Sequence, residues 1–456
     1  MVLHDRRQRA EVDQLVEECT VQGMSRREFM RRSLALGLSA SVAGALFAAC
    51  GSGASSSNTV DLLSVWGGEE QASFKAVVAP FTQQTGIKIT VESTRDLPTV
   101  LTTRIRGNNP PDIAILPNPG QMQQFAKQGK LVALDSFLDM SKVRNDYASS
   151  WIDLGSYNGK LYAIFYKAAN KGTVWYNPGQ FQSNGYTIPG TWQDMITLSD
   201  NIAGSGKHPW SMGVSAGAAS GWPAADWVAQ IYLNQFGPDM YDKWVAHQIP
   251  WTDSSIKTAF QMFGQIVTGT NYINGAPQFI LATDPQTASF LPFENPPKAY
   301  MYYEGDFVSG FITTQFPNIQ PGTGFNYFPF PTINPQYAGA VTVGADVVVA
   351  MRNTDAVQKL VKYLETAAAQ EIWIKRGGFT SVNKSVDVST YPNVVAQNVA
   401  KMLTAAPITK FGADDLMPSQ VETAFWQATV KFIGNPSQLD SILSDVENTA
   451  SQAYTS

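Results

Sequence analysis

Three short polar clusters in the first third of this 456-residue chain hold side chains that could do chemistry. They are residues 66–70 (Trp-Gly-Gly-Glu-Glu), 94–96 (Thr-Arg-Asp) and 117–119 (Pro-Asn-Pro). Carboxylates accept hydrogen bonds, arginine and amide groups donate them, and a tryptophan ring offers a flat apolar face. Together these groups suit the binding of a polar organic molecule, and the glycines permit it to approach the backbone closely.

The segments that separate these clusters predict a parallel β-sheet. Their order is strand 60–66, helix 71–84, strand 87–93, helix 97–106, strand 112–116 and helix 121–128. A β-α-β-α-β order implies parallel strands with right-handed crossovers. Ligands of open α/β sheets bind beyond the carboxyl ends of the strands, which is where all three clusters lie. The alternative for Glu69 is a place in the first helical turn, where its charge complements the helix dipole.

Further polar groups follow apolar stretches in the second half of the chain. Residues 299–303 predict a strand that ends on the acidic run 304–306. Residues 341–351 predict a long apolar strand, and residues 354–376 predict one amphipathic helix. Trp222 stands between a glycine and a proline, a composition that predicts a loop and an accessible ring.

The composition argues against several classes of function. A net charge of −5 disfavours nucleic acid or an anionic membrane surface as the main partner. The two cysteines, Cys19 and Cys50, lie near the N-terminus, so the rest of the chain holds no disulfide and no thiolate metal site. The three histidines are scattered without a His-Glu-x-x-His motif. We therefore expect neither a catalytic metal nor a cofactor.

The first 49 residues have the layout of an export signal. A charged stretch containing Arg26 and Arg27 precedes an apolar segment of about 16 residues, which is short for a membrane-spanning helix of about 20. The arginine pair resembles a twin-arginine signal. We expect residues 1–49 to be this signal, with Met1 or Met24 as the start of translation.

The apolar segment ends at Cys50, which is the expected site of lipidation. Residues 47–50 resemble a bacterial lipobox, although Phe47 stands where leucine is usual. In such a motif the cysteine is acylated and becomes the new N-terminus, and two or three acyl chains hold a protein durably at a membrane. The small polar residues 50–57 then form a flexible tether.

Several segments, in their order along the chain, resemble a known family. They include residues 66–70, 109–112 (Asn-Pro-Pro-Asp), 174–177 (Val-Trp-Tyr-Asn), 301–305 (Met-Tyr-Tyr-Glu-Gly) and 377–379 (Gly-Gly-Phe). They are similar to the carbohydrate-binding branch of the extracellular solute-binding proteins of ABC importers, related to maltose- and α-glucoside-binding proteins. The resemblance covers nearly all of the chain after the signal.

The resemblance implies an α/β fold with two lobes and a ligand cleft between them, the type II periplasmic-binding-protein fold. It places residues 58–167 and 333–377 in one lobe, and residues 168–332 and 378–456 in the other. It also implies an extracytoplasmic, lipid-anchored monomer that passes a carbohydrate to the permease subunits of an importer, with no nucleic-acid partner. An α-glucoside, a disaccharide or a short oligosaccharide is expected, with linkage and chain length left open.

The residue types suit a sugar, because carboxylates and amides bond to hydroxyl groups and aromatic rings stack on the apolar ring face. Trp222 is the aromatic residue most expected to stack, and Trp426 is a second candidate by resemblance. The expected ligand-binding residues are Trp66, Gly67, Glu69, Arg95, Asp96, Asn118, Trp222, Asp226, Glu304, Gly305, Asp306, Asp346 and Trp426.

Two other classes of function stay open at this stage. A glycoside hydrolase also uses paired acids in an aromatic cleft, with its two carboxyl groups about 5 to 10 Å apart. Glu69 and Glu304 could form such a pair. An adhesin or structural lipoprotein would bind no small ligand. The expected lobes and the lack of a catalytic signature favour a binding protein that is not an enzyme.

Overall fold

The parallel strands predicted near residue 60 form the centre of one half of the molecule, the first lobe. The computed structural model describes residues 31–32, 58–94 and 97–455. β1 (Thr59–Ser64) pairs in parallel with β2 (Lys88–Ser93) and β3 (Ile113–Leu116). α4 (Gly68–Thr85) and α5 (Leu97–Arg106) are the crossovers, and α6 (Pro119–Lys127) follows β3. The predicted β-α-β-α-β order is confirmed.

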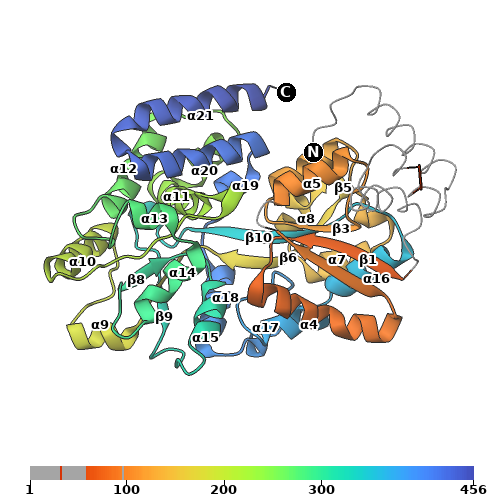
Figure 1. Ribbon diagram of the computed structural model, residues 1–456, viewed down its shortest axis with the longest axis horizontal. Coiled ribbons are helices and arrows are strands. Elements are labelled where there is room, and N and C mark those ends of the chain that lie inside the picture. The colour runs from red at the N-terminus through yellow and green to blue at the C-terminus, as the bar shows by residue number, and fades with distance from the viewer. Residues whose placement is uncertain (1–30, 33–57, 95–96, 456) are drawn as a thin grey trace.

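Two long strands, β10 (Val341–Ala350) and β6 (Ala163–Asn170), extend from this sheet toward the other half of the molecule (Figure 1). β10 pairs antiparallel with β3 through residues 347–350 and with β6 along most of its length. β11 (Thr409–Phe411) pairs with residues 341–343 at the opposite end of β10. The two ends of β10 thus pair with different strands. β10 and the neighbouring β6 run between the two halves and connect them.

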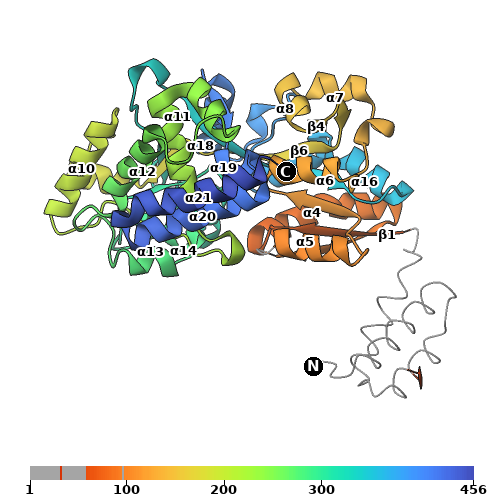
Figure 2. The same cartoon turned by 90° about the horizontal axis from the view of Figure 1, so that it is seen from above.

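The large sheet is covered by helices on both faces (Figure 2). Successive residues of a strand point to opposite faces, so Leu62 packs with α4, α16 (Asp355–Leu364) and α17 (Ala367–Ile374). Leu63 packs on the other side with α5, α6 and α8 (Ser149–Leu154). Burial of both faces explains why β3 has a continuous apolar sequence.

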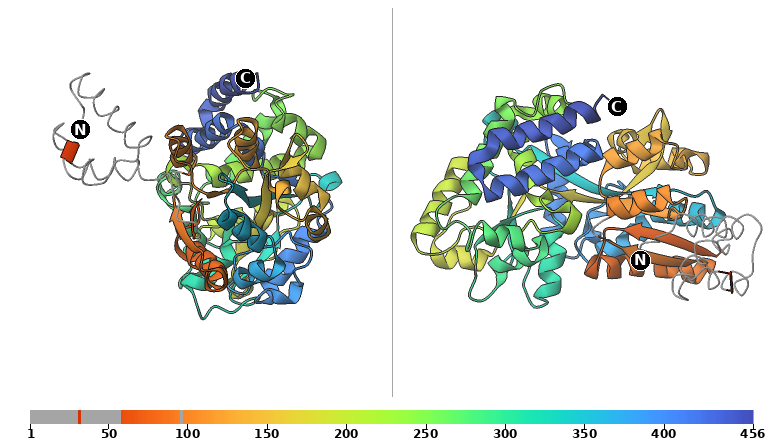
Figure 3. Two further views of the ribbon diagram at one scale, coloured as in Figure 1. Left: turned by 90° about the vertical axis from the view of Figure 1, so that its right-hand side faces the viewer. Right: turned by 45° about the horizontal axis from the view of Figure 1, so that its top comes forward.

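The second lobe is built on a smaller antiparallel sheet. β7 (Thr173–Tyr176), which follows β6 directly, lies between β8 (Met301–Tyr303) and β9 (Asn326–Pro329). Most of its helices surround a core that contains Trp227 and Phe425. Figure 3 shows that the two helices nearest the C-terminus, α20 (Ser419–Gly434) and α21 (Leu439–Ala453), run side by side over this lobe.

The remaining elements complete the two lobes. Those early in the chain are α7 (Met140–Asp146), β4 (Ser156–Tyr157), β5 (Lys160–Leu161), α9 (Pro178–Asn184), α10 (Trp192–Gly204) and α11 (Trp222–Val245). Those in the middle are α12 (Ser254–Val267), α13 (Gln278–Ala282), α14 (Pro285–Phe290) and α15 (Val308–Gln315). The last are α18 (Val394–Ala405), α19 (Ala413–Leu416), α20 (Ser419–Gly434) and α21 (Leu439–Ala453).

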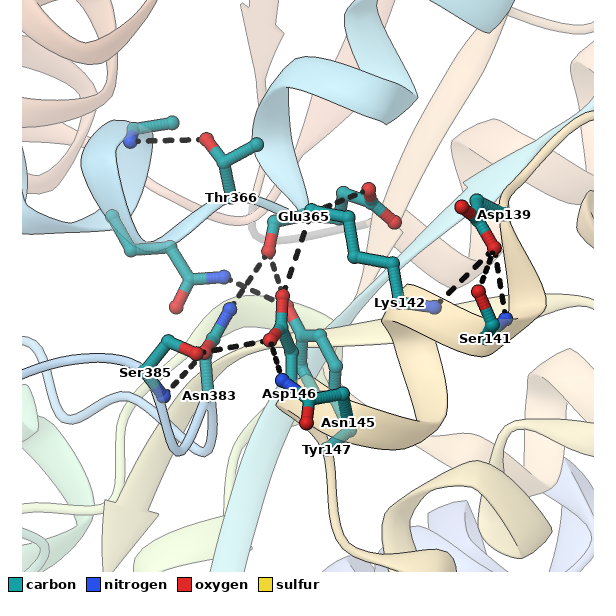
Figure 4. A network of polar contacts seen from close by, with 12 residues as sticks. Asp139, Ser141, Lys142, Asn145, Asp146, Tyr147, Glu365, Thr366, Asn383 and Ser385 are labelled. Carbon is teal, nitrogen blue, oxygen red and sulfur yellow. Dashed lines mark hydrogen bonds and ion pairs between the residues drawn. The ribbon is translucent and has the colours of Figure 1, made fainter.

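The single helix predicted over residues 354–376 is wrong, because the chain breaks between α16 and α17. The Thr366 hydroxyl accepts an N–H of the first turn of α17 and so starts a new helix. The break frees the Glu365 carbonyl, which accepts hydrogen bonds from the Tyr147 hydroxyl and the Asn383 amide (Figure 4). A buried polar network thus compensates for the lost helical turn.

The loop predicted around Trp222 is also wrong, because Trp222 is the first residue of α11. Gly221 precedes the helix with a φ of 106°, and a Cβ there would lie 2.2 Å from the Trp426 carbonyl oxygen. Pro223 stands in the first turn of α11, where its missing N–H is not needed. The glycine and proline that suggested a loop are therefore helix-start residues.

The lobe boundaries expected from the sequence stay a prediction. Residues 378–456 were expected in the second lobe, yet β11 pairs with β10 in the large sheet. Leu403 and Phe411 pack with Phe165 against the same sheet. This part of the chain therefore contributes to the packing of both lobes.

Gln230 of α11 holds the crossing strand β10 to the second lobe. Its Nε2 donates to the Ala340 carbonyl at 2.9 Å, and its Oε1 accepts the N–H and hydroxyl of Thr342, each at 2.7 Å. Gln230→Leu removes the acceptor of the buried Thr342 N–H and hydroxyl, while the Ala340 carbonyl keeps the Asn234 amide as a donor. We expect the variant to lower the free energy of unfolding by about 3 kcal/mol in urea titrations. Gln427→Leu, at an exposed position of α20, is the control. Equal stability of the two variants would contradict this role.

Candidate functional site

Two lysines of the crossing segment, Lys167 and Lys171, are the centres of the candidate site. Lys171 Nζ lies 2.7 Å from Asp226 Oδ1 and 3.7 Å from Asp415 Oδ2. Lys167 Nζ lies 2.7 Å from Glu70 Oε1. The two lysines are only 5% and 7% exposed. Buried charges persist when they are paired, so these ion pairs bind the crossing strand to the helices around it.

The group around Lys171 joins an aromatic ring to two carboxyl groups. Trp222 is half-buried, and its ring centroid lies 5.6 Å from Lys171 Nζ. Asp226 lies one turn further along α11, and Glu304 follows β8. Both carboxyl groups are fully buried. The ring, the cation and the acids thus come from three different elements of the second lobe and the crossing segment.

Burial determines the protonation of these acids. It raises the pKa of Glu304 well above its usual value, and the neighbouring Asp226 raises it further. Burial also raises the pKa of Asp226, although Lys171 opposes this effect. Each carboxyl group thus influences the pKa of the other, and both pKa values are shifted toward the protonated form.

Asn118 connects this group to the first lobe. Its Nδ2 donates to Glu422 Oε1 of α20 at 2.5 Å, and both side chains are buried. Burial raises the pKa of Glu422 well above its usual value, and the negative charge of Asp415 adds to the shift. The backbones are close here, because a Cβ on Gly120 would lie 2.5 Å from the Met417 carbonyl oxygen. The start of α6 therefore fits directly against the segment before α20.

The group around Lys167 holds two further acids. The Trp66 indole N–H donates to Asp346 Oδ2 at 2.7 Å, and burial raises the pKa of Asp346 to about 6. Asp306 Oδ2 accepts the Thr380 hydroxyl at 2.5 Å, and burial raises the pKa of Asp306 to about 6 as well. Lys167 opposes both shifts through its positive charge.

Several buried acceptor atoms of the site have no N–H or O–H donor from the described chain. They are Asn118 Oδ1, Gln121 Oε1, Asp226 Oδ2, Glu304 Oε1 and Asp414 Oδ1. A buried acceptor without a donor costs free energy, and each of these can accept a hydrogen bond from an enclosed molecule. The arrangement is therefore chemically suited to a ligand that carries many donors.

The described residues also form a groove apart from this site, but no metal-binding cluster and no helix that could cross a membrane. A groove of about 580 Å³ lies between α8, α18 and β11, and none of the expected ligand-binding residues lines it. Within residues 58–94 and 97–455, no cluster of three or more His, Cys, Asp or Glu side chains is arranged to hold a metal ion. No helix in the described part of the chain is long and apolar enough to cross a membrane.

Comparison with known sequences decides the family. The sequence model of the family described as bacterial extracellular solute-binding protein matches residues 67–371. The chain belongs to this family. The solute-binding protein is 34% identical over 376 residues to the osmoprotective compounds-binding protein GgtB of Synechocystis sp., covering 82% of this chain and 88% of the relative. It is 33% identical over 396 residues to the alpha-glucosides-binding periplasmic protein AglE of Rhizobium meliloti, covering 84% and 85%.

Solved structures confirm the two-lobe, type II fold of the solute-binding protein. The crystal structure of the bacterial solute receptor AcbH aligns with a TM-score of 0.75 and 21% sequence identity, covering 87% of this chain and 98% of that chain. At this level of identity the likeness concerns the fold alone. The family resemblance and the α/β two-lobe fold expected from the sequence are both confirmed.

The structure brings together most of the residues expected to bind ligand. Trp222, Asp226 and Glu304 lie around Lys171. Gly305 is adjacent, and its N–H donates to the Glu304 carboxylate. Asn118 is connected to the same group through Glu422. Its amide donates to Glu422, and the nearby charges of Asp415 and Lys171 shift the pKa of Glu422. The remaining members, Trp66, Asp306 and Asp346, surround Lys167.

Other expected residues lie elsewhere. Glu69 is exposed in the first turn of α4, 3.8 Å from Arg376, as its alternative role in the helix start predicts. Gly67 is the residue before that helix. Trp426 is 7% exposed in the core of the second lobe, but its N–H donates to Asp414 at 2.7 Å, so it lies beside the acids of the site. Arg95, Asp96 and Cys50, with the predicted tether and all of the export signal but Arg31 and Arg32, lie outside the described residues.

Sequence reasoning missed several charged members of the site. They are Glu70, Lys167, Lys171, Asp414, Asp415 and Glu422. Lys167 inside the buried strand β6 and Lys171 directly after it were an available signal, since a lysine is rarely buried without a partner. The partners themselves lie too far away in the sequence for any local pattern to identify them.

The buried Asp306 predicts an unusual pH dependence of stability. Its pKa of about 6 exceeds the usual 3.8, so the folded protein keeps a proton that the unfolded chain loses. The resulting stabilisation is present below about pH 4 and is lost as the pH rises through 6. Between about pH 5 and 8, the free energy of unfolding of the wild type should fall by about 1 kcal/mol more than that of Asp306→Asn.

Thermal and urea unfolding across this pH range measure the difference. Asp445→Asn, which changes an exposed carboxylate on α21, is the control and should follow the wild type. If Asp306→Asn also follows the wild type, the buried carboxyl group does not carry the predicted proton.

Proposed function

We propose that this solute-binding protein captures an α-glucoside, of the size of a disaccharide or short oligosaccharide, between its lobes and delivers it to an ABC-type permease. The observation that carries the proposal is the group of buried acceptor oxygens beside the half-buried Trp222. Sugar hydroxyl groups can donate to these oxygens, and the ring of Trp222 offers a surface for the apolar face of a sugar.

Relatives support the choice of ligand class. One is an α-glucosides-binding protein, a second binds osmoprotective compounds, and a third, from Streptococcus mutans, is a multiple sugar-binding protein with 24% identity over 311 residues. Their names describe binding proteins, which supports a role in capture over glycoside hydrolysis.

Closure of the lobes is the proposed mechanism of capture. Asn118 and Asp346 approach the site from the first lobe, and Trp222 and Glu304 approach it from the second. Only a closed form lets one ligand contact both sets, so a ligand that bonds to both favours closure. The permease then distinguishes the closed, loaded form from the open one.

The proposed location is the outer face of the bacterial cell membrane or the periplasm, since the family is extracellular. The proposal includes export by the twin-arginine route, acylation of Cys50 and a monomeric state. The lipid would hold the protein near its permease, and residues 50–57 would leave the lobes free to move.

Calorimetry against a panel of α-linked di- and oligosaccharides tests the proposed function. We expect binding heat without any cleaved product in chromatography. Trp222→Ala and Glu304→Ala should each weaken the affinity more than tenfold, about 1.4 kcal/mol, because each removes a proposed direct contact. Trp151→Ala changes another half-buried tryptophan, which lines the separate groove between α8, α18 and β11, and it should bind like the wild type. Wild-type affinity in both site variants would remove them from the site, and product formation would favour the hydrolase.

Cys50→Ser tests the proposed anchor. A serine cannot form the thioether through which a lipobox cysteine is acylated, so the variant should move from the membrane fraction to the soluble extracytoplasmic fraction. Incorporation of labelled fatty acid should be lost at the same time. Continued association of the Cys50→Ser protein with the membrane would show that a different anchor is used.

A further inference from the structure

The group around Lys171 contains many more acids than cations. The pKa of Lys171 is raised by the negative charges of four nearby acids, Asp226, Asp415, Asp414 and Glu304. Glu422 extends this acidic group toward Asn118. The other buried lysine of the site, Lys167, is held by Glu70 and has Asp306 and Asp346 nearby. We call the residues Asp226, Glu304, Asp414, Asp415 and Glu422 the acidic cluster.

Lys171 cannot serve as a free receptor for an anion. Its Nζ is occupied by Asp226 at 2.7 Å, lies 3.7 Å from Asp415 and is 5.6 Å from the ring centroid of Trp222. Its stem is packed against the crossing strand, where a Cβ on Gly344 would lie 2.8 Å from Lys171 Cε. The lysine is therefore committed to the acidic cluster.

The hydrogen-bonding capacity of the cluster is strongly one-sided. Its unpartnered buried atoms are acceptors, on Asp226, Glu304 and Asp414, and Asn118 adds another. The unpartnered buried donors include Nδ2 of Asn170, which precedes Lys171, and the hydroxyl of Tyr166, which precedes Lys167. An ammonium group that reaches Asp226 Oδ2 and Glu304 Oε1 would donate to both.

We propose that the acidic cluster selects sugars by charge, binding a saccharide with a protonated amino group more tightly than its hydroxyl counterpart and rejecting uronates and sugar phosphates. This inference rests on the proposed function. An ammonium group brings three donors and a positive charge, whereas a hydroxyl group brings one donor. Hydrogen bonds between charged partners are roughly twice as strong as neutral ones.

An anionic sugar meets the opposite situation. A carboxylate or phosphate group brings a negative charge to a site where Lys171 is already paired with Asp226, so this charge would be buried without a cationic partner. Taking such a charge out of water without a partner costs several kcal/mol. The acidic cluster therefore acts against these ligands even where their ring and linkage fit.

Three single-ring probes of equal size test this selection by calorimetry. They are methyl α-glucoside, its 2-amino-2-deoxy analogue and methyl α-glucuronide, at about pH 6.5, below the usual pKa of an amine. We expect the amine to bind about tenfold more tightly than the glucoside, about 1.4 kcal/mol, and the glucuronide at least tenfold more weakly. Glu304→Gln should reduce the advantage of the amine to about twofold or less, because it removes one carboxyl group with little change in shape.

Glu365→Gln is a matched control. Glu365 is also buried and also has an unpartnered carboxylate oxygen, but it bonds to Lys142 in the network of Figure 4, outside the acidic cluster. This variant should keep the full advantage of the amine. If Glu304→Gln does not fold by circular dichroism, Glu422→Gln replaces it.

The outcomes separate the two proposals. If the glucoside binds and the amine is no tighter, or the glucuronide is tightest, charge selection is overturned while sugar capture stands. If none of the three single-ring probes binds but the α-linked oligosaccharides do, charge selection is overturned and sugar capture stands; if the oligosaccharides do not bind either, both proposals fail. Loss of the preference in Glu365→Gln would also overturn the inference, because the effect would not come from the acidic cluster.

Discussion

The buried ion pair between Lys171 and Asp226 is the constraint on which the rest of the site depends. Removing two charges from water is costly, and the attraction between them compensates only when their geometry is good. Lys171 follows directly after β6, at the point where the chain enters the second lobe, and Asp226 belongs to α11. Gly344 of the neighbouring β10 leaves room for the lysine stem. The crossing segment, the helix and the site therefore share one arrangement.

This arrangement also limits what can bind. The additional acids make the interior of the site rich in acceptors, and several of them have no donor among the described residues. Under the proposed closure mechanism, a ligand with many donors supplies these hydrogen bonds and so favours the closed form.

The sequence predicted the local elements well, because hydrophobic periodicity depends on residues that are close in the chain. Phe74, Val77 and Phe81 recur at helical spacing, and they are buried on one face of α4. The prediction failed where a single side chain outweighed the pattern. Thr366 starts a new helix inside an apolar periodic stretch. Pro223 suggested a loop but stands in the first turn of α11.

Sequence by itself determined the family, the parallel strand order and the places where polar groups follow strands, since each of these is written in local pattern and segment order. Only the tertiary structure decided which polar groups meet. Asn118 bonds to a residue 304 positions away, and Lys171 to one 55 positions away. It also decided that Glu69 faces solvent while Glu70 pairs with Lys167. Pairing and protonation depend on burial and distance between segments that are remote in the chain, and no local pattern encodes either quantity.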